Sequence, residues 1–373
     1  MLGTLIPLLK VHMPETASEA LRPVLASGYL ADGAQVRQFE ETLSAAIGNP
    51  HVTAMSDVSG AITLALFMAG VRPGDEVIAP PMCCTATTMP MANLFARAVW
   101  CDVDPLTGML DPNRIAALIT PRTRAVLGYH WAGDVAAIEQ VVAVAHAHGL
   151  KTIDDASDGF GAECRGRRLG NQGSDFTAYS FHAAKHITTG EGAALFFASP
   201  ADAERAQWLK RYGIHQPSFR LPDGDLNEQS DIPVAGYNFY MNNLAATIGI
   251  EQMSHADRLV ARHRANGLFY EEALDEIPGV TQLTRRRDAV SAYWAYTILV
   301  ERRSDLIRKL REQGITSQRL HLRNDRYTCF DPAGRPPLPG VDVFDRKALS
   351  LPCGWWVADA DREQIASVIR EGW

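Results

Sequence analysis

The sequence contains no apolar run that approaches the roughly 20 residues needed to cross a membrane; residues 192–199 are typical of its longest apolar stretches. It also lacks a long basic tract, because its longest run of Lys or Arg is residues 285–287. With 36 basic and 43 acidic residues the formal net charge is −7. The sequence therefore shows no cluster of positive charge that would bind the phosphates of a nucleic acid. The only lysine near the N-terminus, Lys10, follows the apolar segment, unlike in a signal peptide. We therefore expect a cytoplasmic protein that binds neither nucleic acid nor membrane.

Cysteine is also sparse, with six residues in a chain of 373 and no pair at the CxxC spacing. This pattern favours unpaired thiols in a reducing compartment, and it predicts neither a metal site nor a disulfide framework. The remaining composition, 46% hydrophobic and 21% charged, is that of a globular protein. A chain of this length has room for two domains of roughly 100–200 residues each.

Short apolar runs alternate with helical patterns in the first half of the chain. The predicted strands are residues 52–56, 77–79, 98–103, 124–130 and 150–153, and the predicted helices are residues 59–69, 85–94, 111–119 and 135–148. This alternation predicts an α/β fold in which helices flank both faces of a mostly parallel central sheet. Two further strand-like runs, residues 176–181 and 193–198, follow with only a loop between them.

The pattern changes in the second half. Residues 214–236 are rich in Pro, Gly, Asp and Gln without any period, which is typical of a long functional loop. A helical pattern then covers about residues 242–276, with a break predicted near Ser254. We place a boundary near residue 255, so that residues 1–255 form a large domain and residues 256–373 a smaller α+β domain. The elements expected there are strands at 293–300 and after Gly314, and helices at 304–313 and 361–371.

Polar residues follow three of the predicted strands, at the carboxyl ends where open parallel sheets place their active sites. Residues 56–59 (SDVS) lie between a strand and a helix, where hydroxyl and backbone N–H groups can bind a phosphate. The alternative is that Ser59 only caps the helix. Residues 152–162 (TIDDASDGFGA) place two acids and then Asp158 after an apolar strand, and a buried acid needs a partner.

The third group is residues 179–195 (YSFHAAKHITTGEGAAL), with Lys185 in the loop between two apolar strands. A lysine in a loop is usually a solvated charge, but small and hydroxyl residues crowd this one, as a Schiff-base lysine requires. Pyridoxal phosphate (PLP) catalysis combines all three groups. It needs a lysine for the cofactor's aldehyde, an aspartate for the pyridinium proton and a helix N-terminus for the phosphate.

Taken together, these stretches resemble the DegT/DnrJ/EryC1/StrS group of sugar aminotransferases, which are fold-type-I PLP enzymes. The resemblance covers nearly the whole chain, in the family's order: SGYLADGAQVRQFE (27–40), PGDEVIAP (73–80), DVDPLTGMLDP (102–112) and ITPRTRAV (119–126). IDDASDGFGA and SFHAAKHITTGEGAAL resemble the two signature stretches of the site. GYNFYMNNLAATIG (236–249) resembles the segment that reaches into the neighbouring subunit.

The resemblance implies roles for the matching residues. Lys185 would form the internal aldimine and move a proton between the substrate carbon and the cofactor. Asp155 would pair with the pyridine nitrogen. The phosphate would be held at two strand ends, by Ser180, Ser59 and the backbone of Val58. Asn238 of the partner subunit would complete the phosphate site, which places the active site at a homodimer interface.

Several positions differ from the family's pattern. Val58 and Ser59 replace Gly and Thr, so the hydroxyl remains while the loop becomes less flexible. Cys84 stands where an aromatic ring normally stacks on the cofactor; sulfur can pack on a ring, but stacking area is lost. Asp158 replaces a Gln that faces the cofactor's 3-hydroxyl, and an acid there would repel the phenolate oxygen. Tyr240 replaces an Arg.

We therefore expect a PLP-dependent sugar aminotransferase (EC 2.6.1 type) that works by ping-pong chemistry with Lys185 as general base. L-Glutamate or L-glutamine would donate the amine, and a keto sugar linked to a nucleotide would accept it. A sugar 3-dehydratase of the same fold has His in place of the lysine, which argues against that activity here. A PLP-binding regulatory protein without turnover is the alternative that Cys84 and Asp158 keep open.

The acceptor stays open at the level of the sequence. A keto-inositol, a 3-keto or 4-keto hexose and a nucleotide-linked amino sugar all fit. The candidate diphosphate or sugar contacts are residues 214–236 and the basic residues Arg319, His321 and Arg323. The alternative for these basic residues is a solvated surface.

Overall fold

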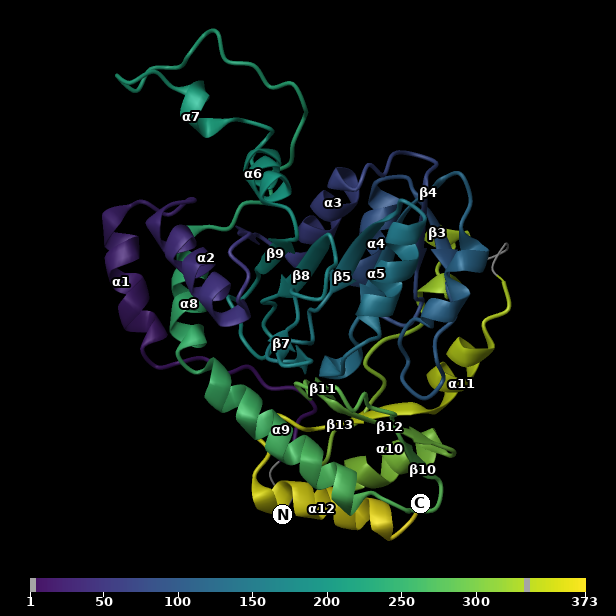
Figure 1. The fold of residues 1–373 in the computed structure, drawn as a ribbon. Coiled ribbons are helices and arrows are strands. Elements are labelled where there is room, and N and C mark those ends of the chain that lie inside the picture. Colours follow the sequence, from purple (N-terminus) through teal and green to yellow (C-terminus); the bar gives the residue numbers. More distant parts are fainter. Residues whose placement is uncertain (1–4, 332–335) are drawn as a thin grey trace.

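Seven strands form the central sheet, in the order β1-β9-β8-β5-β4-β2-β3 (Figure 1). Their bounds are β1 (Val52–Met55), β2 (Glu76–Ala79), β3 (Arg97–Trp100), β4 (Thr123–Tyr129), β5 (Lys151–Asp155), β8 (Phe176–Ser180) and β9 (Ala193–Phe197). Neighbouring strands run parallel except at β9, which is antiparallel to both β1 and β8. The computed structural model describes residues 5–331 and 336–373, and it confirms the predicted α/β class with a mostly parallel sheet.

Helices cover both faces of this sheet, because successive side chains of a strand point to opposite sides. In β2, Val77 and Ala79 pack into one apolar layer and Ile78 packs into another. The first layer includes residues of α3 (Val58–Met68), α4 (Thr85–Asn93) and α6 (Pro200–Leu209). The opposite face is covered by α2 (Ala34–Ile47), α5 (Ile138–Ala147) and α8 (Asn243–Met253), with α1 (Ala17–Ser27) against α8. None of the helices built by the described residues is both long and apolar enough to span a membrane.

The C-terminal part begins with α9 (Ala256–Ala273) and contains a three-stranded antiparallel sheet. Its order is β10 (Val280–Gln282), β12 (Tyr296–Val300) and β13 (Ala348–Leu351), and α9, α10 (Arg303–Glu312) and α12 (Asp359–Arg370) pack on it. Near the start of the chain, Ile6 pairs with Ile315 and so joins this part. The break between α8 and α9 confirms the one predicted near Ser254, while the division into domains 1–255 and 256–373 stays a prediction.

Two smaller features connect the parts. The strands β6 (Glu163–Cys164), β7 (Arg167–Arg168) and β11 (Ala289–Val290) form a third sheet, in the order β11-β6-β7. This sheet pairs a segment after β5 with one that precedes β12. The helix α11 (Pro339–Lys347) packs its buried residues into the apolar layer of α3 and α4. The helix α11 thereby joins the C-terminal part of the chain to the central sheet.

The helix predicted at residues 111–119 was wrong. The segment forms two 3₁₀ turns, η1 (Pro112–Arg114) and η2 (Ala116–Leu118). A run this short, which ends just before Pro121, offers too few i→i−4 hydrogen bonds to offset the cost of starting an α-helix.

Two other predictions also need correction. Among the described residues no strand begins directly after Gly314, because Ile315 and Gln318 form single bridges to separate partners, and the next strand is β13. The helix α3 begins at Val58 rather than at Ser59, and its N-cap is Asp57, which accepts a hydrogen bond from the N–H of Gly60 (2.7 Å). Ser59 is therefore not the cap.

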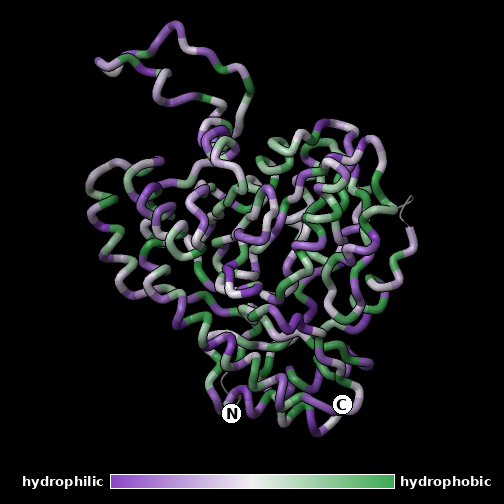
Figure 2. The backbone as a smooth tube through the Cα atoms, in the orientation of Figure 1, coloured by the Kyte–Doolittle hydropathy of each residue, from purple (hydrophilic) through white to green (hydrophobic). Residues whose placement is uncertain are grey.

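The irregular stretch predicted at residues 214–236 forms an arm that extends away from the rest of the chain (Figure 1). Its only helix among the described residues is the single turn α7 (Gln216–Phe219). A bridge between Arg211 and Asn238 closes its base. Hydrophobic and hydrophilic stretches alternate along it (Figure 2), and its exposed apolar side chains are Leu221, Leu226, Ile232 and Val234. The arm has little contact with the core of its own chain.

Candidate active site

The carboxyl ends of the parallel strands bring several predicted site residues to one edge of the sheet. In the register of β4 and β5, Tyr129 lies opposite Asp155. Asp155 in turn lies opposite the residue of β8 that precedes Ser180 by two. Ser180 lies opposite Ala193 of β9, which also pairs with Met55 at the end of β1. Because α3 starts just after β1, the acid, the serine hydroxyl and the helix N-terminus lie along the same edge.

The two adjacent acids at the end of β5 point to opposite faces of the sheet. Asp155 is buried and accepts hydrogen bonds from Thr87 Oγ1 (2.6 Å), from the N–H of Ser157 (3.0 Å) and from the Ser157 hydroxyl. Asp154 instead faces His130, whose Nε2 lies 3.0 Å from Asp154 Oδ1, and both side chains are fully buried. Since Thr87 belongs to α4, Asp155 is the acid on the face that carries α3 and α4.

Lys185 belongs to a chain of four linked polar side chains. Its Nζ donates to Asp158 Oδ1, and the hydroxyl of Tyr129 donates to Asp158 Oδ2 (2.5 Å). The Tyr129 oxygen also lies 3.1 Å from His321 Nε2. Asp158 is fully buried, whereas 11% of the Lys185 side chain is exposed. The lysine amine is also 4.0 Å from the centre of the Trp294 ring.

Burial fixes the protonation states of Tyr129 and His321 in this chain. It raises the pKa of Tyr129, and the negative charge of Asp158 adds to the shift, so the tyrosine keeps its proton. Burial lowers the pKa of His321 to about 4, so its imidazole is neutral near pH 7. Because Tyr129 donates its single proton to Asp158, His321 Nε2–H is the donor to the Tyr129 oxygen. Asp158 therefore accepts hydrogen bonds from Tyr129 on one side and from Lys185 on the other.

Cys84 lies in the middle of these groups. It is half-buried and directly precedes α4. The charges of Lys185, Asp155 and Asp158 are close enough to affect the pKa of its thiol. Burial raises the pKa of its thiol, which therefore stays protonated near pH 7. The position predicted from the sequence for the ring of the cofactor is thus surrounded by the predicted lysine and both acids.

The N-terminus of α3 carries an unexpected acid. Asp57 accepts hydrogen bonds from the Ser56 hydroxyl (2.9 Å) and the N–H of Gly60. The N–H groups of Val58 and Ser59 lie in the first turn and have no acceptor within the helix. The Ser59 hydroxyl donates to the Ala86 carbonyl (3.3 Å) and can still accept a hydrogen bond. Two backbone donors and a hydroxyl thus remain for a phosphate, beside one carboxylate.

Asn238 is exposed in the single chain and lies at the base of the arm. The next residue, Phe239, crosses the start of α3: its carbonyl accepts from the N–H of Ser56 (2.7 Å), and its ring packs against Gly60. A Cβ added to Gly60 would lie 3.0 Å from that ring. The arm is therefore anchored at the predicted phosphate end of the site.

The residues present fit PLP, judged by the unmet needs of Asp155. This carboxylate is buried and hydrogen-bonded, yet it forms no ion pair with any cationic side chain of the described residues. Burial raises the pKa of Asp155, which marks the cost of a negative charge without a cation. The N–H of a pyridinium ring is the kind of partner that would stabilise it. Lys185 and the N-terminus of α3 complete the set of groups that this cofactor requires.

Comparison with known proteins agrees with this fit. The chain belongs to the DegT/DnrJ/EryC1/StrS aminotransferase family, whose model matches residues 12–370. It is accordingly a PLP-dependent aminotransferase, which confirms the resemblance noted in the sequence.

Individual relatives match over nearly their full length. The sugar aminotransferase CalS13 from Micromonospora echinospora is 33% identical with a TM-score of 0.93, and the alignment covers 99% of this chain and all of CalS13. AtS13 from Actinomadura melliaura is also 33% identical, with a TM-score of 0.94 and complete coverage of both chains. The spore coat polysaccharide biosynthesis protein SpsC from Bacillus subtilis (strain 168) is 28% identical over 97% of this chain and 96% of SpsC.

Sequence reasoning missed part of the site. Tyr129 ends an apolar strand and was read only as a strand residue, and Trp294 lies in a segment predicted to be a strand. Arg323 is paired with Asp325 and Asp342, so its guanidinium is not simply solvated, and its role as a ligand contact stays a prediction. His321, proposed as a sugar or diphosphate contact, turns toward Tyr129.

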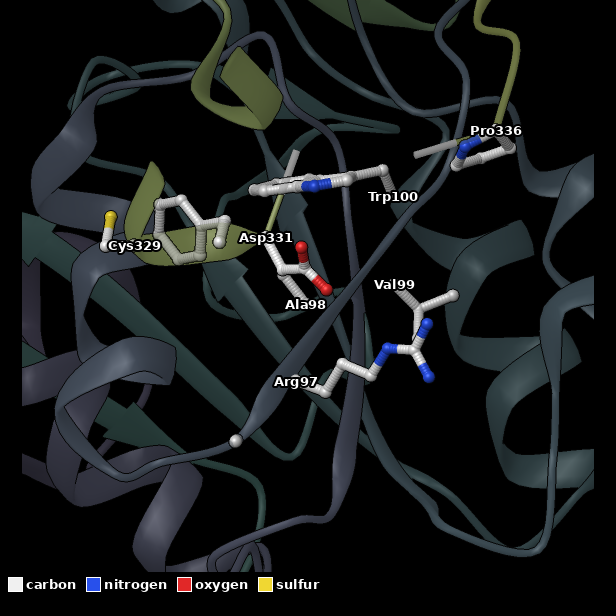
Figure 3. Close-up of a pocket in the computed structure, with 9 residues that line it drawn as sticks. Arg97, Ala98, Val99, Trp100, Cys329, Asp331 and Pro336 are labelled. Atoms are coloured by element: carbon white, nitrogen blue, oxygen red, sulfur yellow. The ribbon is translucent and has the colours of Figure 1, made fainter. Parts of the chain in front are cut away.

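A separate hollow of about 260 Å³ lies at the edge of the sheet, between β3 and a second segment that contributes residues 329–331 and Pro336 (Figure 3). Arg97, Trp100 and Asp331 are among its lining side chains, and Trp100 packs edge-on against Phe330. None of the residues around Lys185 lines it. This hollow is therefore distinct from the lysine site.

Proposed function

We propose that this chain transfers an amino group from L-glutamate or L-glutamine to a keto sugar carried on a nucleotide, in two half-reactions at Lys185. The observation that carries the proposal is the lysine amine held by the buried Asp158, together with a second buried acid, Asp155, that has no cationic partner among the described residues. The naming of CalS13 as a sugar aminotransferase supports a sugar as the acceptor. The involvement of SpsC in polysaccharide biosynthesis supports the same class.

In this proposal each side chain has one task. Bound PLP supplies an electron-withdrawing ring that stabilises negative charge at the donor's α-carbon. Asp155 holds the ring's N–H, and Thr87 and Ser157 keep that carboxylate oriented and ionised. Lys185 Nζ removes the proton from the substrate carbon once it is neutral. Asp158 and Tyr129 position the lysine.

The phosphate end of the site is proposed to use Ser180, Ser59 and the backbone N–H of Val58. A helix N-terminus with free N–H groups favours an anion, which supports this assignment. Asp57 opposes it with a like charge. Cofactor binding is therefore expected to be weaker than with an uncharged residue at that position.

The experiment that tests the function is an absorbance spectrum of the purified protein with PLP, before and after addition of each amino donor. Loss of the yellow cofactor band, with release of the donor's keto acid, would support the first half-reaction. Incorporation of the amine into nucleotide-linked keto sugars, followed by mass spectrometry, would identify the acceptor. A yellow band that neither donor changes would favour the regulatory alternative instead.

We also propose that two copies of the chain share the site, with Asn238 of the partner subunit completing the phosphate contacts. The exposure of Asn238 and the extended arm that it closes support an intermolecular role. Sedimentation velocity should then report a dimer. A fully active monomer would contradict the shared site.

Replacing Asp158 with Gln should preserve cofactor binding or strengthen it up to about tenfold. Glutamine can accept from Lys185 through its oxygen and donate its amide N–H to the Tyr129 oxygen, while removing the negative charge that repels the cofactor's phenolate oxygen. The measurement is a titration of the apoprotein with PLP, followed by absorbance. Tyr129→Phe, which keeps the Asp158 charge, serves as the control and should not tighten binding. Complete loss of binding in Asp158→Gln would mean that the acid contacts the cofactor directly.

A further inference from the structure

A basic hollow of about 460 Å³ lies between α10 and residues 315–322, in the C-terminal part of the chain. Arg303, Ile307 and Arg311 follow one another at four-residue spacing, so they share the face of α10 that lines it. Ser317 and Arg319, two residues apart, line it from the opposite segment. Its volume is in the range of small-molecule sites, and none of its lining residues is an acid.

The positive charge in this hollow is incompletely balanced. Arg319 lies 3.3 Å from a carboxylate oxygen of Asp345. Arg303 binds only backbone carbonyls, including that of Ala348 (3.1 Å), which do not neutralise its charge. Burial and the nearby charge of Arg319 lower the pKa of Arg303. Arg311 has no ion pair within the described residues. Arg303 and Arg319 place two like charges close together in a concave site, which favours an anion between them.

Ser317 gives an independent sign of a ligand. Its side chain is only 6% exposed, and its Oγ has no hydrogen-bond partner among the described residues. Most buried polar atoms in proteins are paired, because leaving one unpaired costs the free energy of removing it from water. A buried hydroxyl that lines a hollow beside arginine residues is suited to donate to an oxyanion.

We propose that this hollow binds a phosphate-bearing ligand, whose oxygens contact Arg303, Arg311 and Arg319 and accept a hydrogen bond from Ser317. Guanidinium groups match the geometry of phosphate oxygens, and several of them together favour a diphosphate. Leu5, Leu320 and Leu322 add apolar surface at the same hollow for the rest of the ligand. Binding of this ligand requires neither the amino donor nor turnover at Lys185.

The hollow adjoins the lysine site through His321. This residue lines the hollow and also contacts Tyr129, which is bonded to Asp158. A ligand here therefore lies beside His321, which is the outer end of the chain of side chains that holds the lysine. The phosphate groups would come either from the nucleotide of the acceptor sugar or from a free phosphorylated metabolite.

The test is isothermal titration of the PLP-saturated protein with inorganic pyrophosphate, because saturation keeps the probe from the cofactor's own phosphate site. Arg311→Gln and Ser317→Ala should each weaken binding at least about fivefold. Arg308→Gln is the matched control: Arg308 is on the same helix, is paired with Asp305 and lies outside the hollow, so the affinity should not change. The proposal would be overturned if pyrophosphate did not bind. It would also be overturned if Arg311→Gln and Ser317→Ala bound pyrophosphate as tightly as the unaltered protein.

A second titration with uridine diphosphate distinguishes the two sources. Binding at least tenfold tighter than that of pyrophosphate, and sensitive to the same two substitutions, would identify a nucleoside diphosphate as the ligand. Equal or weaker binding would identify a free phosphorylated metabolite. Since neither titration contains an amino donor, failure of the proposed transamination would leave both results interpretable.

Discussion

Replacing Lys185 with Ala should lower the rate of amino transfer by at least about 10³-fold, because the substitution removes both the nucleophile and the proton carrier. In the part of the chain that the structure describes, Lys185 is the lysine that pairs with Asp158, and the other paired lysines have partners elsewhere. The buried Lys210 is bound to Thr53 Oγ1 (2.7 Å) and to Glu40 (3.3 Å) in a different part of the sheet. The measurement is release of keto acid from L-glutamate or L-glutamine by the PLP-saturated variant.

Lys185→Arg separates chemistry from charge in the same experiment. Arginine keeps a positive charge beside Asp158, so the variant should fold with an almost unchanged melting temperature. It should nevertheless be as inactive as Lys185→Ala, because a guanidinium does not lose its proton at neutral pH. Retained transamination in either variant would show that another amine reacts with the cofactor.

Asp155→Asn should leave PLP bound but lower turnover on the order of 10²-fold or more. Asparagine can still accept from Ser157 through its oxygen, and its amide N–H can donate to the Thr87 hydroxyl, so the local structure should survive. It cannot keep the cofactor's ring nitrogen protonated, since it carries no negative charge. Absorbance should show a filled site, while stopped-flow traces with the amino donor should show slow loss of the yellow band.

Asp154→Asn is the matched control for this prediction. Asp154 is adjacent in sequence but lies on the opposite face, where its partner is His130. The substitution should therefore leave turnover close to that of the unaltered protein and lower the free energy of unfolding by about 1–3 kcal/mol. Urea unfolding and the same kinetic assay measure the two effects. The opposite result, with an active Asp155→Asn and an inactive Asp154→Asn, would mean that the wrong acid has been assigned.

This pair of acids illustrates what the sequence can determine. The end of a buried strand and the presence of two acids are visible in TIDDAS, and the period of two places the acids on opposite faces. The sequence does not tell which face carries the site. The structure does, because Thr87 of α4 donates a hydrogen bond to Asp155. The assignment from the resemblance agrees with this geometry, although the role itself awaits the experiment above.

Other parts of the site could not be predicted because their contacts join distant segments. Tyr129 and His321 are 192 residues apart, and neither has a local pattern that indicates the other. The missed helix α2 is different, because its buried residues Val36, Phe39, Leu43 and Ile47 follow helical spacing. That pattern was available in the sequence. The strand β13 follows α11 without an intervening turn, so no turn residue marks where it begins.

The pairing of Ile6 has a consequence for how the chain is made. Its N–H donates to the Gly314 carbonyl, and its own carbonyl accepts from the N–H of Thr316, both at 2.9 Å. These partners are translated roughly 300 residues later, which at about 5–20 residues per second is a delay of roughly 15–60 s. During that time Ile6 has no partner for this pairing. The segment around Ile6 can thus take its final place only after residues 314–316 have been translated.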